Sequence, residues 1–106
     1  MSSFDQREKA FEKKYEHDQM FAFKVNARRN KLLGLWAAAQ LGLGGSEADA
    51  YAKQVVQADF TKPGDDDVLA KVLGDLQGKG LDVSEHRVRR QMNELLSVAK
   101  EQVASE

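Results

Sequence analysis

The chain has 106 residues, a formal net charge of -1 and hydrophobic residues at 42% of its positions. This length suits one domain with one modest core, and the near-neutral charge argues against a nucleic-acid-binding module, which is usually strongly basic. Cysteine is absent, which excludes a disulfide scaffold, a thiol nucleophile and any zinc site built on thiolates.

No targeting segment is evident. The first 20 residues lack the uninterrupted apolar stretch of a secretory signal. The most apolar segment, residues 32–43, is too short to span a bilayer. We therefore expect a cytoplasmic protein without direct membrane insertion.

Glycine-rich breaks divide the chain into four pieces. The breaks are "GLGG" at 42–45, "KPG" at 62–64 and "GKG" at 78–80. Within each piece, apolar residues recur at steps of three and four, which is typical of helices that face a core. We predict an all-α fold, a four-helix bundle.

The first piece, residues 3–41, is too long for such a bundle. As one helix it would measure about 60 Å, whereas helices of roughly 12–20 residues in the other pieces would measure about 18–30 Å. Residues 32–41 are apolar almost all round, so we expect the bundle to surround that half. The N-terminal half must overhang the bundle, fold back after a break or stay unstructured.

Aromatic residues in the N-terminal half form a narrow stripe among many charges. Phe4, Phe11 and Tyr15 are spaced seven and four apart, close to a coiled-coil seam. Alone in water such a short helix is marginal, but burial of each ring contributes about 1.5–3 kcal/mol, enough to fold the segment in a partner's groove. The residues leave open whether the stripe binds a partner or packs on its own bundle. Phe21 falls off the stripe and is assigned to the bundle.

A basic cluster follows, formed by Arg28, Arg29 and Lys31. It could bind phosphate or an acidic surface, but no glycine-rich phosphate loop accompanies it. We favour a solvated charged shoulder at the end of the bundle. Gly34 lies inside the helical pattern at a cost of about 1 kcal/mol relative to alanine, which predicts a close helix approach there.

The second piece opens on "SEAD", in which Ser46 is a predicted N-cap with Asp49 at the third helical position. Its apolar stripe then runs to Pro63. The residues of this stripe are Ala48, Tyr51, Ala52, Val55, Val56 and Phe60.

The third piece starts with three consecutive acids, Asp65–Asp67. These acids suit the positive end of a helix dipole and can cap it. A divalent-ion site is the weaker interpretation, because no loop of alternating ligands follows. The apolar face comprises Val68, Leu69, Val72, Leu73 and Leu76.

The fourth piece begins "VSEHRV". Ser84 is the predicted N-cap, and Val83 can pack against Val88 in a hydrophobic staple. The adjacent basic run, residues 86–90, is interpreted as a solvated face. The stripe reaches the C-terminus through Val88, Met92, Leu95, Leu96, Ala99 and Val103.

Catalysis is poorly supported by the sequence. The chain contains two histidines, His17 and His86, and no pair of acids at a spacing that implies a shared site. Helical runs rich in Glu and Asp are more often solvated faces than acid/base pairs. We expect a protein that is not an enzyme and that carries no metal or cofactor of its own.

Four stretches together resemble the alphaproteobacterial ATP synthase zeta subunit family, which is also catalogued as a domain of unknown function. These stretches are "FDQREKAFEKKY" near the N-terminus, "ARRNKLLGLWAAAQLGLGG", "EADAYAKQVVQADF" before the Pro/Gly break, and "MNELL" in the last helix. The resemblance covers nearly the whole chain.

The resemblance implies a four-helix protein that inhibits ATP hydrolysis by the rotary F-type ATP synthase. It implies a mobile N-terminal arm, residues 1–19, that becomes helical between catalytic subunits and rotor, and an anchoring bundle, residues 20–106. Carried over by position, the buried face of the arm would be Phe4, Phe11 and Tyr15, and its polar contacts Arg7, Glu8, Glu12 and Lys14.

The partner implied by the resemblance is the catalytic head of the ATP synthase, at the inner face of the plasma membrane. Some family members are also associated with weak ADP or ATP binding, for which Arg28, Arg29 and Lys31 are only electrostatically plausible. An adenine-nucleotide-binding helical sensor, or an adaptor module without inhibitory action, is the alternative. Inhibition requires the N-terminal arm, whereas the sensor or adaptor does not.

Overall fold

The computed structural model describes residues 2–61 and 64–106, and the side chains of residues 18–59 and 64–106. The helices are α1 (Ser2–Gln40), α2 (Gly45–Thr61), α3 (Asp65–Gly78) and α4 (Glu85–Ala104). The predicted all-α fold with four helices is confirmed, and the connections between the helices fall at the glycine-rich breaks.

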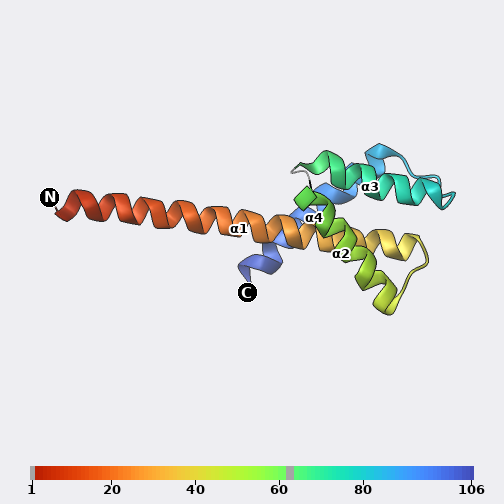
Figure 1. Cartoon of the computed structure of the whole chain (residues 1–106), viewed down its shortest axis with the longest axis horizontal. Helices are drawn as coiled ribbons and strands as arrows, with labels where there is room; N and C mark the ends of the chain where they lie inside the picture. Colours follow the sequence, from red (N-terminus) through yellow and green to blue (C-terminus); the bar gives the residue numbers. More distant parts are fainter. Residues whose placement is uncertain (1, 62–63) are drawn as a thin grey trace.

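Helix α1 is the long axis of the molecule. Its C-terminal half contacts all three other helices, whereas its N-terminal half projects away from them (Figure 1). With 39 residues, α1 is about 58 Å long, and the principal extents of the molecule are 65 × 25 × 22 Å. Of the three arrangements that the sequence left open, the structure adopts the overhang.

Two helix ends share one glycine-dependent geometry. At the end of α1, Gly42 has φ +79°, and the N–H of Leu43 donates to the carbonyl of Ala38 at 2.9 Å. The end of α3 repeats the pattern with φ +88° at Gly80 and with Leu81 as the donor. Both are Schellman ends, in which the leucine that follows packs back onto the core.

Gly34 lies at a close approach of α1 and α2. A β-carbon built on Gly34 would lie 2.6 Å from the α-carbon of Ala52, a backbone atom that cannot rotate away. The predicted close approach is therefore confirmed, and its partner is identified as α2.

The main core is an apolar cluster to which all four helices contribute. It fills the bundle between the second half of α1 and the other helices, and the apolar stripes predicted for α2, α3 and α4 supply most of it. Its buried members are Leu33, Ala37, Ala38, Tyr51, Val55, Val68, Leu69, Val72, Leu76, Val88 and Met92.

A smaller apolar cluster, which we call the root cluster, lies between α1 and α4. Its buried members are Val25, Ala99 and Val103, with partly buried Phe21, Leu32 and Leu96 packed against them. The assignment of Phe21 to the bundle is confirmed. The root cluster lies where α1 leaves the bundle.

The helix starts agree with the sequence in one case and differ in two. Ser84 caps α4, since its Oγ accepts a hydrogen bond from the N–H of Arg87 at 3.2 Å. The predicted N-cap at Ser46 is wrong, because α2 already begins at Gly45, whose φ of +57° suits glycine far better than serine. At α3 the predicted aspartate cap is wrong, because Gly64 takes the cap position without a side-chain hydrogen bond, whereas Asp65–Asp67 occupy the first turn as predicted for the positive end of the dipole.

Candidate functional site

The arm continues α1 beyond the bundle. Residues 2–19 lie within the helix, whose period of 3.6 residues brings positions 4, 11 and 15 to one side of it. The predicted contact residues all lie in this segment, and their side chains lie outside the described residues. They are Phe4, Arg7, Glu8, Phe11, Glu12, Lys14 and Tyr15.

Large apolar side chains remain exposed at the root of the arm. Met20 is 62% exposed and Phe23 is 58% exposed, while Val25 is 3% exposed. Among the side chains described in α1, Phe21 is the first that packs against an apolar cluster. The transition from projecting helix to packed helix therefore takes place between residues 20 and 25.

The basic residues at 28, 29 and 31 do not form a cluster. The Arg28 guanidinium donates to Gln102 at 2.9 Å and pairs with Glu106, Arg29 is buried, and Lys31 is exposed beside α2. The predicted charged shoulder is wrong for Arg29, because each residue along a helix turns by about 100° and the three point to different surroundings.

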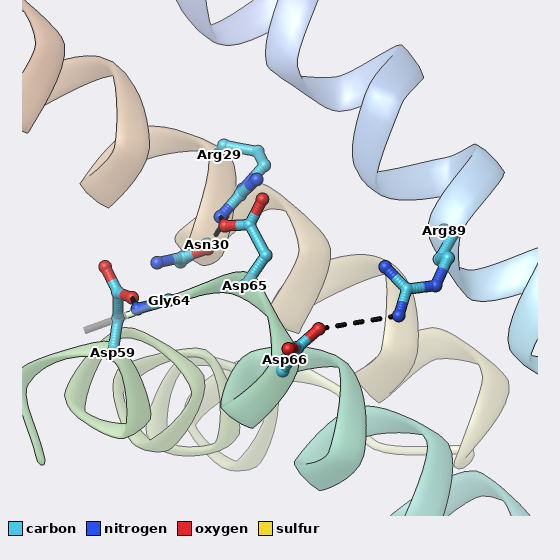
Figure 2. A network of polar contacts seen from close by, with 7 residues as sticks. All are labelled: Arg29, Asn30, Asp59, Gly64, Asp65, Asp66 and Arg89. Carbon is cyan, nitrogen blue, oxygen red and sulfur yellow. Dashed lines mark hydrogen bonds and ion pairs between the residues drawn. The ribbon is translucent and has the colours of Figure 1, made fainter. Parts of the chain in front are cut away.

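Arg29 forms a buried ion pair that joins α1 to α3. Its side chain is 4% exposed, and its Nη2 lies 2.7 Å from Asp65 Oδ1, while its Nε donates to Asn30 Oδ1 at 3.0 Å. Figure 2 shows Arg29 reaching from α1 toward the first turn of α3. The sequence contained a signal for this burial, since Arg29 lies midway between Val25 and Leu33 on the core-facing side.

The same contact sets the electrostatics of the first turn of α3. The hydrogen bond from Arg29 lowers the pKa of Asp65 below its usual value, although partial burial opposes the shift, and the charges of Arg29 and Arg89 add to it. Asp66 lies 3.5 Å from Arg89 of α4, as Figure 2 shows. These acids therefore link α3 to α1 and α4.

Tyr51 forms a further polar contact at the core. Its hydroxyl donates to Asp75 Oδ2 at 2.8 Å, and Lys71 Nζ lies 3.1 Å from the same oxygen. Burial raises the pKa of Tyr51 well above its usual value, and the contact with Asp75 adds a smaller rise. The phenol therefore stays protonated at neutral pH and serves as a hydrogen-bond donor between α2 and α3.

One open cavity of about 570 Å³ lies along α1 and α2. It is lined by Lys31, Asp49, Ala52, Lys53, Val56 and Gln57. Of the basic residues suggested for nucleotide binding, only Lys31 lines this cavity.

Two further properties concern the described residues. They contain no group of three or more His, Cys, Asp or Glu side chains placed to hold a metal ion. None of the helices in this part of the chain combines the length and the apolar character that crossing a bilayer demands.

Comparisons with known proteins connect this geometry to a family. The family model described as ATPase inhibitor subunit zeta matches residues 1–102. A chain determined as a solution NMR structure is 53% identical; the match covers 78% of this chain and 94% of that chain, with a TM-score of 0.69. No curated protein matches the sequence.

The family match includes the arm as well as the bundle. It begins at residue 1 and continues to residue 102, close to the end of α4. The projecting helix therefore lies within the stretch that the family model matches. The chain belongs to the ATPase inhibitor subunit zeta family.

Proposed function

We propose that this protein inhibits ATP hydrolysis by the rotary F-type ATP synthase through its N-terminal arm. The arm binds as a helix between the catalytic subunits and the rotor, on the cytoplasmic side of the membrane that holds the enzyme. The bundle anchors the arm and takes no part in chemistry. The observation that carries the proposal is the overhang of α1 in a member of an ATPase inhibitor family.

The overhang leaves the arm available to a partner. In Figure 1 the first part of α1 lies beyond the ends of the other helices, so the bundle offers it no groove. Burial of each aromatic ring in a partner contributes about 1.5–3 kcal/mol. Together with the hydrogen bonds of the helix itself, three such rings help to offset the cost of ordering a short helix upon binding.

The roles of individual residues follow from their positions along the arm. Phe4, Phe11 and Tyr15 form the face that is buried in the enzyme. The charged residues that flank this face make the polar contacts at its rim, where each contributes less than a buried ring. These rim residues are Arg7, Glu8, Glu12 and Lys14.

The central ring of this face provides a direct test. We expect Phe11→Ala to weaken inhibition of the cognate enzyme by about 2–4 kcal/mol, as for a ring that fills a pocket. The measurement is the rate of ATP hydrolysis against the concentration of added protein. Lys13→Ala is the matched control, because position 13 lies on the opposite side of the helix, and it should inhibit like the wild type. Equal inhibition by the two variants would contradict the assigned face.

The alternative is a nucleotide-sensing module without inhibitory action. It is less well supported, because Arg28 and Arg29 are engaged in ion pairs within the chain. The basic residues that line the α1–α2 cavity, where a phosphate could pair, are Lys31 and Lys53. Titration with ADP, followed by backbone amide shifts, tests this function. A saturating shift without enzyme inhibition would favour it over the inhibitor.

A further inference from the structure

The last turns of α4 pack against the root of the arm. The root cluster joins Val25 of α1 to Ala99 and Val103 of α4, and none of the described side chains of α2 or α3 belongs to it. The main core, by contrast, takes its buried α4 members, Val88 and Met92, from the first half of that helix. The two halves of α4 therefore serve different parts of the molecule.

A polar contact accompanies this packing. The guanidinium of Arg28 donates to Gln102 Oε1 at 2.9 Å and pairs with Glu106 at the end of the chain. Arg28 belongs to the turn of α1 that follows Val25, so polar and apolar contacts hold the same stretch. Gln102 and Val103 belong to the last turn of α4, and Glu106 lies two residues beyond its end.

The contacts between the end of α4 and α1 stop where the arm begins. An open cleft of about 530 Å³ lies at this end of the root cluster, lined by Met20, Phe21 and Lys24 of α1 and by Val103, Ala104 and Glu106. Met20 is 62% exposed. The last packed turn of α1 is therefore the one that contains Phe21 and Val25.

We infer that the last turns of α4 position the arm, and that Arg28, Gln102 and Val103 are its positioning residues. They keep residues 21–28 helical in the free protein and thereby determine where the arm starts and in which direction it leaves the bundle. This inference rests on the proposed inhibitory function and identifies residues outside the arm on which that function depends.

The physical reason is conformational entropy. Ordering each backbone residue costs about 1–2 kcal/mol, so a root that frays must be reordered whenever the arm binds. If the helical root is populated in one tenth of the molecules, the apparent affinity falls roughly tenfold. A residue that stabilises the root therefore acts on inhibition without contacting the enzyme.

Three valines of α4 provide matched variants for the test. Val103 is 7% exposed at the root, Val88 is 0% exposed in the main core, and Val98 is 39% exposed on the outer face. Each is replaced by alanine in the full chain. The measurements are amide exchange of residues 21–28 in the free protein, the thermal midpoint, and the concentration that halves ATP hydrolysis by the cognate enzyme.

We expect Val103→Ala to accelerate exchange across residues 21–28 and to raise the half-inhibitory concentration roughly tenfold. Val88→Ala should lower the thermal midpoint more but leave inhibition unchanged at temperatures well below it, and Val98→Ala should change neither. Arg28→Gln, which removes the ion pair, should shift exchange and inhibition in the same direction as Val103→Ala by a smaller factor.

Two outcomes would overturn the inference. One is inhibition by Val103→Ala at the same concentration as Val98→Ala. The other is a rise in the half-inhibitory concentration for Val88→Ala that equals the rise for Val103→Ala, which would indicate general destabilisation. If the proposed function is wrong, the result is different, because a chain without residues 2–19 would then inhibit ATP hydrolysis to the same extent as the full chain.

Discussion

At the scale of single residues, the contact between Arg29 and Asp65 joins the helix that carries the arm to the rest of the bundle. The Arg29 side chain is 4% exposed and that of Asp65 is 60% exposed. A buried guanidinium that loses its acid remains charged away from water, which is more costly than the loss of a surface pair. The pair therefore matters chiefly because Arg29 is buried.

Asp65→Asn should destabilise the protein by about 1 kcal/mol at neutral pH, a figure discounted because Asp65 is largely exposed. Urea unfolding measures this difference. Asp66→Asn is the matched control, since Asp66 is 90% exposed and lies 3.5 Å from Arg89, and it should change stability by less than about 0.5 kcal/mol.

We expect the stability difference between the wild type and Asp65→Asn to depend on pH. The pKa of Asp65 is lowered in the folded protein, so the stabilisation is present above the ordinary aspartate pKa and is lost as pH falls through the lowered one. The wild type should therefore lose its advantage over Asp65→Asn in acid. A constant difference between them down to low pH would contradict this assignment.

Gly34 and Gly74 make a second pair of residue-scale tests. Gly34→Ala introduces a β-carbon 2.6 Å from a backbone atom of Ala52, so we expect destabilisation by about 1–2 kcal/mol despite the better helix propensity of alanine. Gly74→Ala meets nothing within 4 Å and should stabilise α3 by up to about 1 kcal/mol. Thermal unfolding measures both, and stabilisation by Gly34→Ala would contradict the close helix approach.

At the scale of elements, periodicity and breaks were enough to predict the four helices and their core-facing stripes. The burial of Val68, Val72 and Leu76 in α3 follows from their three- and four-residue spacing. The N-cap at Ser84 followed from its position before the apolar run. These features are local, which is why sequence patterns reveal them.

The errors arose where tertiary packing or backbone conformation decided the outcome. Serine is a favoured N-cap residue, which is why Ser46 was predicted, but α2 begins one residue earlier, at Gly45, which has a positive φ. Arg28 and Arg29 are neighbours in sequence and were grouped as one basic cluster. Their ion-pair partners are Glu106 and Asp65, far away along the chain, and no local pattern identifies such partners.

At the scale of the whole molecule, the length of α1 relative to the bundle decides the architecture. Helices of 17, 14 and 20 residues cannot cover a helix of 39 residues. Arithmetic on the sequence predicted this mismatch, and the structure resolved it as an overhang. The residues that contact a partner could not be predicted in the same way, because that surface belongs to two proteins.

Deletion of residues 2–19 tests the central claim, that this segment serves a partner and not the protein's own core. The truncated chain keeps both apolar clusters, so we expect its thermal midpoint to stay within about 2 °C of the wild type and its inhibition of ATP hydrolysis to be lost. A midpoint many degrees lower, or full inhibition without the arm, would contradict the account.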